Sequence, residues 1–382
     1  MIAGGITAVT VFLGSAHNIV EMDKNITIHS QFGHLQVATV KAWDPKAGDS
    51  IKDRTFLPDP ELLHKISRLP EVNSISARTS VYGLINNGEN SIGAVGIGLD
   101  PEKESQMMAR LKILNGRRLD SNSAFEILLG KGLRSQIGAE PGTRLTLIAT
   151  TQDGSINAVD VEVAGVFLSG LAEFDNNTFY APLGVVQKLL DTSKVDRLVV
   201  MLKDTETTAA AQKKLDLLLP ADLESRSWWQ LSDIFRKLLS FCQVEDGLIE
   251  WILVLLAVLA VGNTVSASIM ERTGEIGTQR ALGDTRRDIF QQFIWEGLFL
   301  GVAGGLVGVT FGLGTALVLN RLHLPLEYPG MTDPITIHVD ILPFSFLQFF
   351  LVSCAMAVAA SVVPAWKIAR VQIVGALKRN IV

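Results

Sequence analysis

Long apolar runs with few charged side chains constrain this sequence more than any other feature. An α-helix needs about twenty apolar residues to cross the hydrocarbon core of a bilayer. Three such runs follow one another after residue 247: Leu248–Met270, Phe293–Asn320 and Ile341–Trp366. The first twenty residues also lack a formal charge, and we interpret them as another spanning helix. The sequence therefore predicts a membrane protein with four transmembrane α-helices.

The beginning of the chain admits a second interpretation. A signal peptide also has a short apolar core, and Gly14–Ala16 offers the small residues of a cleavage site. Signal peptides begin with basic residues, and none precedes this core. We therefore favour a first transmembrane helix and the start of a stalk in residues 1–24, with a basic flank that lies outside this numbering.

The distribution of charge divides the chain into two kinds of segment. Charged residues make up 19% of the 382 residues, below the value of about 25% for soluble proteins. The deficit lies in residues 1–20 and 248–366, whereas residues 25–245 have the composition of a globular domain.

The net charge of −5, without a basic stripe interleaved with aromatic residues, argues against nucleic acid as a partner.

Basic residues in short loops indicate how the chain is oriented, because such loops stay in the cytoplasm. The predicted loop 271–292 and the tail 367–382 contain eight of them: Arg272, Arg280, Arg286, Arg287, Lys367, Arg370, Lys378 and Arg379. The loop 321–340 contains only Arg321. The loop 271–292 and the tail are therefore predicted to be cytoplasmic, and the loop 321–340 and residues 25–226 to lie outside.

Residues 25–226 are predicted to form an α+β domain. Alternation and β-branched residues predict strands at 34–40, 72–81, 91–99, 126–129, 144–150, 159–168 and 195–202. Amphipathic spacing predicts helices at 58–69 and 205–219. Val20–Ser30 and residues 227–247 are predicted as helical extensions of the neighbouring spans, so that the domain stands on a helical stalk. A flexible linker is the alternative, but residues 227–247 lack a Gly/Pro/Ser cluster.

No catalytic motif stands out. Gly130–Gly132 resembles a phosphate-binding loop superficially, but its spacing is wrong, and there is no GxSxG, HExxH or kinase set. The six histidines are scattered, and Cys242 and Cys354 lie next to or within apolar runs. We expect no catalytic, cofactor-binding or metal-binding residues in this chain.

Small residues occur at helical spacing within the apolar run Phe293–Asn320. They are Gly297, Gly301, Gly304, Gly305, Gly308 and Gly312. Glycines at this spacing let two helix backbones approach closely in lipid. The contact could join two subunits of a dimer or pack helices within one subunit. Glu296, near the cytoplasmic end of the same run, is expected to reach the interface, with a role in transport as the alternative.

The charged segment Glu271–Phe290 separates two of the apolar runs. Asp284 is predicted to be the N-cap of the helix that follows. By composition alone, the segment offers mixed charges together with Ile276, Ala281 and Leu282 to a cytoplasmic partner. The other interpretation is an ordinary solvated loop.

Four segments carry a family resemblance. ERTGEIGTQRALGDTRRDIFQQFIWEGLFLGVAGGLVG (271–308) resembles the signature of FtsX/MacB-type ABC transporter permeases, among them the lipoprotein-releasing (LolC/LolE-like) permeases. PAWKIAR (364–370) followed by GAL (375–377) resembles the end of these proteins. GRRLDSNSAFEILLGKGLRSQIGAEPGTRLTL (116–147) and GVFLSGLAEFDNNTFYAPL (165–183) resemble their extracytoplasmic core.

The resemblance implies a partnership with an ATPase. It implies four spans, a periplasmic MacB-like core domain between the first two, a homo- or heterodimer of permease subunits in the inner membrane, and a separate cytoplasmic ABC ATPase. ATP and Mg²⁺ would be used by that ATPase, because this chain has no phosphate-binding loop. The residues expected to couple to it are Glu271, Arg272, Glu275, Ile276, Arg280, Ala281, Leu282 and Gly283.

The resemblance also implies mechanotransmission, in which closure of the ATPase moves the cytoplasmic loop, and the spans carry the motion to the outer domain. A lipoprotein or a lipid-like substrate would then be handled on the outer face of the inner membrane, in contact with membrane lipid. Two alternatives stay open. One is efflux of peptides or macrolide-like compounds with a periplasmic adaptor, and the other is an FtsX-like signalling module that regulates a cell-wall hydrolase.

Overall fold

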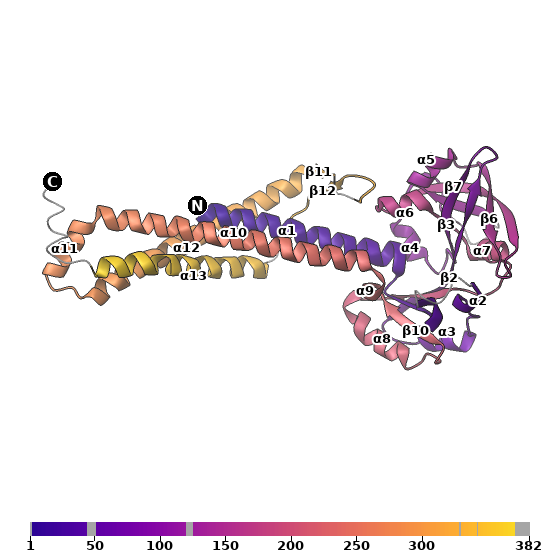
Figure 1. Cartoon of the computed structure of the whole chain (residues 1–382), viewed down its shortest axis with the longest axis horizontal. Coiled ribbons are helices and arrows are strands. Elements are labelled where there is room, and N and C mark those ends of the chain that lie inside the picture. Colours follow the sequence, from indigo (N-terminus) through magenta and orange to yellow (C-terminus); the bar gives the residue numbers. More distant parts are fainter. Residues whose placement is uncertain (1, 44–50, 120–124, 328–329, 342, 371–382) are drawn as a thin grey trace. The chain divides into compact units, whose positions relative to one another are not determined.

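The computed structural model describes residues 2–43, 51–119, 125–327, 330–341 and 343–370. The chain forms two compact units (Figure 1). The helical unit consists of Met1–Glu21, Leu238–Leu326 and Thr336–Val382, and the α/β unit of Met22–Lys237 and Glu327–Ile335. The chain therefore passes between the units at four places. Most of the tail 367–382, including Lys378, Arg379 and residues 375–377, lies outside the described residues.

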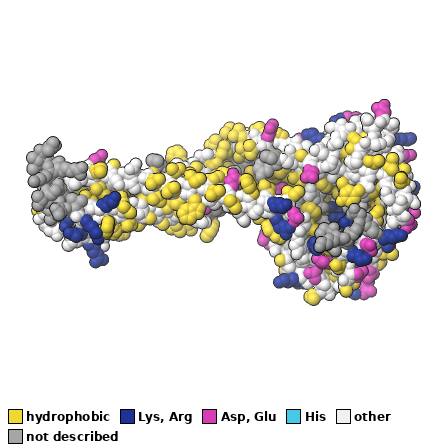
Figure 2. Space-filling view, in the orientation of Figure 1, with side chains coloured by type: hydrophobic (Ala, Val, Ile, Leu, Met, Phe, Trp, Pro, Cys, Tyr) yellow, Lys and Arg dark blue, Asp and Glu magenta, His cyan; other side chains and the backbone are white. Residues whose placement is uncertain are grey.

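Four of the described helices are long and apolar enough to cross a membrane. They are α1 (Ile2–Ile26), which continues as the π-helix η1 (Thr27–Phe32), α10 (Asp233–Glu271), α12 (Arg286–Leu322) and α13 (Pro343–Ala369). Hydrophobic side chains cover most of the helical unit in Figure 2, whereas charged side chains are scattered over the α/β unit. The helices extend beyond the apolar runs because helical hydrogen bonding continues into polar sequence.

Close packing of α12 depends on its glycines. A Cβ atom added at Gly297, Gly301 or Gly305 would lie 2.0–2.8 Å from side-chain atoms of α13. At Gly308 it would lie 2.8 Å from Ile6 of α1, and at Gly312 it would lie 3.3 Å from Thr10. Gly304 lies in a groove lined by residues of α1, α10 and α12. Five of the six glycines therefore serve contacts within this chain.

Polar contacts join the middle of α1 and the end of α12 to the segment before α13. Asp340 accepts from the Asn18 amide at 3.2 Å, lies 2.9 Å from Nδ1 of His17, and its own N–H donates to the Gly14 carbonyl. Asn320 of α12 exchanges two hydrogen bonds with the backbone of Val339, at 3.0 and 2.7 Å. These contacts fix the three segments to one another at one end of the helical unit.

The first sheet of the α/β unit has a βαββαβ arrangement. Its strands lie in the order β10-β1-β9-β2, all antiparallel, and α3 and α8 are the two helices of the arrangement. The elements are β1 (Leu35–Thr39), α3 (Pro60–Ser67), β2 (Val72–Asn86), β9 (Arg197–Leu202), α8 (Thr208–Asp216) and β10 (Leu223–Ser227). Val37, Ile66 and Leu198 lie in the core between the sheet and these helices.

The second half of β2 leaves this sheet and enters a closed barrel. From Thr79 onward β2 pairs with β3, and the ring continues through β8, β5, β7 and β6 back to β2. The barrel strands are β3 (Ser91–Leu99), β5 (Glu126–Gly130), β6 (Arg144–Thr150), β7 (Ile156–Leu168) and β8 (Thr178–Pro182). Their inward side chains form one core with α5 (Lys131–Ile137) and α7 (Leu183–Leu190), which lie beside the barrel in Figure 1.

Shorter elements complete the described chain. They are η2 (Val40–Trp43), α2 (Ile51–Arg54), α4 (Ser105–Arg110), β4 (Lys112–Gly116), α6 (Ala172–Asn177), η3 (Thr205–Thr207), α9 (Trp228–Leu231), α11 (Thr273–Ala281), β11 (Pro325–Leu326) and β12 (Ile335–Thr336). Asp153 and Gly154 lie in the turn between β6 and β7, which pair antiparallel as a hairpin.

The predicted helix over 227–247 that runs into the second span is confirmed from Asp233 onward by α10, whereas its start is wrong, because residues 228–231 form the separate helix α9. Ser227 and Gln230 form a capping box on α9. The Ser232 hydroxyl then accepts from the N–H of Phe235, which begins a new helix. Since β1 and β10 are antiparallel neighbours, η1 and α9 lie at the same edge of the sheet, where the Trp228 N–H donates to the His34 carbonyl at 3.0 Å.

The segment between β11 and β12 packs on the barrel side of the α/β unit. Met331 forms an antiparallel bridge with Leu171, and the Thr332 N–H donates to the Gly170 carbonyl at 3.0 Å. The Thr332 hydroxyl donates to the buried carboxylate of Asp175 at 2.5 Å. Asp333 forms an ion pair with Lys131 at 2.6 Å. The outer loop of the last two spans is thus held on the α/β unit.

We expect Asp333→Asn to loosen this segment at neutral pH. The hydrogen bond from Lys131 lowers the pKa of Asp333. The stabilisation by the ionised Asp333 carboxylate is therefore complete above the ordinary pKa near 4, and it is lost as the pH falls through the lowered pKa. Exchange of the Thr332 amide, corrected for its intrinsic rate, should be about two- to fivefold faster in Asp333→Asn at pH 7, the range for an exposed ion pair. The difference in exchange rate between the two proteins should shrink as the pH falls below the ordinary pKa near 4, and a difference that does not change with pH would contradict this explanation.

Candidate functional site

The helix α11 lies within the charged segment Glu271–Phe290, between α10 and α12. Ile276, only 4% exposed, is buried in a core that includes Ile269 of α10, Ile289 of α12 and Ile368 of α13. Gly274 and Gly277 of α11 are buried as well. α11 is thus packed against the ends of three long helices.

A sharp turn separates α11 from α12. Gly283 has a φ of +121° with no atom within 4 Å of an added Cβ, so the backbone conformation, and not lack of space, requires glycine. The prediction of Asp284 as N-cap is wrong. Thr285 is the N-cap and forms a capping box with Asp288, whereas the Asp284 N–H donates back to the Gln279 carbonyl and ends α11.

Arg280 faces the helical unit as well as solvent. It is half-buried, and its guanidinium donates to the carbonyl of Ala369, the last residue of α13, at 3.3 Å. A positive charge near the C-terminus of a helix is favourable, because it satisfies terminal carbonyls and the helix dipole. Arg280 therefore holds α11 to α13 in addition to any contact with a partner.

The other predicted coupling residues are exposed. They are Glu271, Arg272, Glu275, Ala281, Leu282 and Gly283. Leu282 is 85% exposed. A large apolar side chain surrounded by charged residues has the composition of a protein–protein contact, with an apolar centre and a polar rim. The structure therefore separates the predicted set into an exposed surface and two residues, Ile276 and Arg280, that hold α11 in place.

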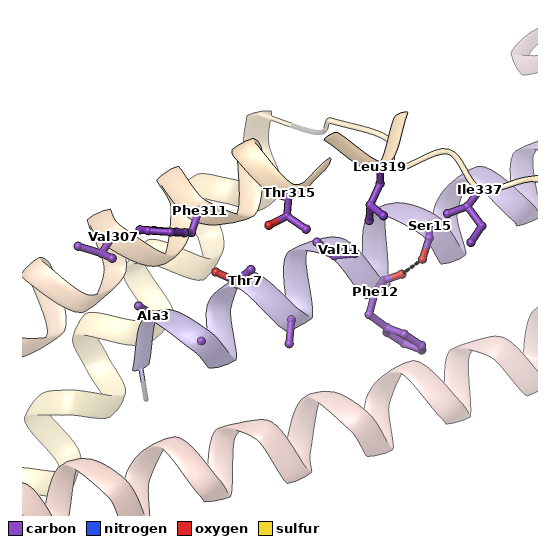
Figure 3. A pocket seen from close by; sticks show the side chains of 12 residues that line it. Ala3, Thr7, Val11, Phe12, Ser15, Val307, Phe311, Thr315, Leu319 and Ile337 are labelled. Carbon is purple, nitrogen blue, oxygen red and sulfur yellow. Dashed lines mark hydrogen bonds between the residues drawn. The ribbon is translucent and has the colours of Figure 1, made fainter. Parts of the chain in front are cut away.

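A second candidate is an apolar groove of about 790 Å³ between α1 and α12 (Figure 3). Its hydroxyl groups are partly occupied by the backbone: Thr7 donates to the Gly308 carbonyl at 3.2 Å and Ser15 to the Phe12 carbonyl at 2.8 Å. Apart from Thr315, the remaining lining is apolar, with Val11, Phe311 and Leu319 among its residues. Its size lies within the range of ligand pockets, and its lining suits an aliphatic chain. The sequence analysis missed this groove, whose only local signal is the set of small residues at the start of α1.

Glu296 contacts α10 in the helical unit. The Ser268 hydroxyl donates to its carboxylate at 3.2 Å. Within the ranges given above for the structure, no three His, Cys, Asp or Glu side chains gather in a way that could hold a metal ion. The candidate sites are therefore a contact surface and a groove.

Comparison with known proteins assigns the chain to a family. Residues 1–218 match the family described as MacB-like periplasmic core domain, and residues 247–373 match the family described as FtsX-like permease C-terminal. The chain belongs to the FtsX/MacB-type ABC transporter permeases. This confirms the resemblance inferred from the sequence. The protein is accordingly a multi-pass protein of the bacterial inner membrane, with its α/β unit in the periplasm and α11 in the cytoplasm.

Three relatives illustrate the similarity. Macrolide export ATP-binding/permease protein MacB of Bradyrhizobium diazoefficiens is 27% identical over 282 residues, which are 70% of this chain and 42% of that protein. ABC transporter permease YknZ of Bacillus subtilis is 28% identical over 175 residues, 44% of each chain. The solved periplasmic region of MacB from Actinobacillus actinomycetemcomitans has a TM-score of 0.38 and 17% identity, and the match covers 53% of this chain and 92% of that one. This chain spans less than half the length of either curated relative.

Proposed function

We propose that this chain is the permease subunit of an ABC transporter that works by mechanotransmission. A separate cytoplasmic ATPase, which uses ATP and Mg²⁺, would bind the exposed surface around Leu282 and move α11. The observation that carries the proposal is the burial of Ile276 among the ends of α10, α12 and α13, while Leu282, at the C-terminal end of α11, is exposed. A displacement of α11 then cannot occur without displacement of these helices.

The proposed substrate is a lipoprotein or another lipid-like molecule, handled at the outer face of the inner membrane. The groove between α1 and α12 supports this class, because its apolar lining fits acyl chains. A second permease subunit would complete the transporter. Efflux of a macrolide-like compound with a periplasmic adaptor is the alternative, favoured by the macrolide export proteins among the relatives.

The test uses the chain together with the ATPase that co-purifies with it, reconstituted in lipid nanodiscs. A triacylated lipoprotein is expected to raise ATP hydrolysis severalfold, whereas a macrolide is not. Val11→Trp, which fills the groove, should remove the stimulation and leave basal hydrolysis unchanged, and Leu217→Trp on the α/β unit is the control for an added indole. Stimulation by the macrolide alone would favour efflux. Absence of any co-purifying ATPase would contradict the proposed function itself.

A further inference from the structure

The end of the first long helix is held in the α/β unit by buried side chains. η1 ends at Gly33, whose φ of +71° lets the chain turn into β1. A helix end leaves carbonyl groups without intrahelical partners. Each of four carbonyls here has a donor: Ile28 from the Gly33 N–H at 2.8 Å, Ser30 from the Tyr180 hydroxyl at 2.8 Å, Gln31 from the Arg78 guanidinium at 2.5 Å and Phe32 from the Gln36 amide at 2.9 Å.

Arg78 is fixed by an ion pair with Glu104 that is closed to water. Two guanidinium nitrogens donate to the two carboxylate oxygens at 2.8 and 2.6 Å, and the side chains are 4% and 2% exposed. Tyr180 is also fully buried, and burial raises the pKa of its hydroxyl, which therefore stays protonated and remains a donor. Every charge and hydroxyl of this group thus has a partner.

The three side chains come from different parts of the α/β unit. Arg78 lies on β2 at the point where this strand passes from the first sheet into the barrel. Tyr180 lies on the barrel strand β8, and Glu104 follows β3. One helix end is therefore bonded to the shared strand and to the barrel at the same time.

A gain in folding stability does not account for an ion pair that is buried this deeply. Removing two charges from water costs about as much as their attraction returns, and apolar residues of similar volume often serve as well or better. What apolar residues cannot supply is a donor in a fixed direction to a helix carbonyl. Arginine supplies a planar group of five donors, which can bind a carboxylate and a carbonyl together.

We propose that Arg78, Glu104 and Tyr180 form a joint that fixes the orientation of η1 on the α/β unit, so that movement of the first helix is passed to β2 and β8. The three are positioning residues for the mechanotransmission described under the proposed function, on which this inference rests. Tyr180 and Arg78 bind the carbonyls of Ser30 and Gln31, and Gln36 binds the next carbonyl, that of Phe32. Three consecutive carbonyls at the end of the helix are therefore held. A hinge at this point is thereby prevented.

The test replaces the polar joint by apolar groups without leaving a buried charge. The joint variant combines Arg78→Met, Glu104→Leu and Tyr180→Phe. Nitroxide labels are attached at two exposed positions, Asn25→Cys on α1 and Glu89→Cys in the β2–β3 turn. They report the distance between the helix and the barrel in the full chain in nanodiscs. The native Cys242 and Cys354 are replaced by alanine so that only the two introduced cysteines are labelled. We expect the joint variant to melt like the parent and to have a distance distribution at least twice as wide. The control, Glu71→Leu with Lys214→Met, removes an ion pair elsewhere in the same unit and should keep the parental width.

A folded joint variant with the parental distance distribution would overturn the proposal. If the triple variant does not fold, Tyr180→Phe alone removes a single donor and should give an intermediate width, whereas an unchanged width again overturns the proposal. With the ATPase present, the joint variant should hydrolyse at least threefold more ATP per substrate moved, and an unchanged ratio despite a wider distribution would show that the joint does not transmit motion. If the parent itself moves no substrate, the proposed function fails, whereas the label distances still decide whether the joint is rigid.

Discussion

Leu282→Asp is expected to abolish coupling to the ATPase while the chain stays folded. Leu282, which follows the last residue of α11, is 85% exposed, so the substitution changes little inside the folded chain. Burial of a leucine at a protein interface contributes about 2 kcal/mol, and a buried unpaired carboxylate adds a further cost. Co-purification of the ATPase should therefore weaken at least about tenfold, and substrate-stimulated hydrolysis should disappear. Titration calorimetry measures the affinity for the ATPase, and the melting temperature shows whether the variant is still folded. A lower affinity with an unchanged melting temperature indicates loss of the contact and not of the fold.

The matched control for this substitution is Leu217→Asp. Leu217 has the same side chain and nearly the same exposure, 87%, but lies in the α/β unit. This variant should bind the ATPase like the parent. If Leu282→Asp bound the ATPase normally, the contact surface would have to lie elsewhere.

Substitutions of the two inward-facing residues should behave differently. Ile276→Ala is expected to destabilise the helical unit by about 2–5 kcal/mol, the range for truncation of a buried side chain. Arg280→Glu removes the hydrogen bond to Ala369 and places a negative charge at the negative end of α13. Loss of transport in Arg280→Glu could therefore come from a lost ATPase contact or from a changed contact between α11 and α13. Leu282→Asp tests the ATPase contact alone.

Gly301→Ile is expected to prevent α12 from packing on α13. A Cβ at Gly301 would lie 2.8 Å from Ala357 Cβ and 3.0 Å from the Cα atom of Cys354. Because one of these neighbours is backbone, a change of rotamer cannot relieve the clash. In lipid, helix association depends on such close approach, and we expect a loss of about 3 kcal/mol or more. Unfolding in increasing dodecyl sulfate and the yield of monodisperse protein measure the effect.

The same helix provides the control for this substitution. An added Cβ at Gly314 meets no atom within 4 Å, so Gly314→Ile adds the same side chain without a clash inside the chain. This variant should unfold like the parent. Equal destabilisation of both variants would indicate a general effect of isoleucine on α12, and would remove the support for glycine-mediated packing.

Two of the strands that the sequence patterns did not predict, β8 and β10, share a physical cause. β8 (Thr178–Pro182) is almost wholly buried and short, so it shows no alternation of apolar and polar residues. β10 contains Glu224 and Arg226 between buried residues and has little apolar character. Both strands are formed by pairing with distant segments, β3 and β5 for the first and β1 for the second. Local sequence does not record such pairing.

The sequence by itself determined the four spans, the cytoplasmic segment Glu271–Phe290 and the family, because hydrophobic length and charge asymmetry act locally along the chain. It grouped Ile276 with Leu282, and glycine spacing alone left the partner of α12 open. Only the tertiary structure decided that Ile276 is buried and Leu282 exposed, that the glycines contact α13 and α1, and that Arg78 reaches the end of η1. Each of these depends on which segments meet in space, and contacts between residues far apart in the chain leave no periodic pattern in the sequence.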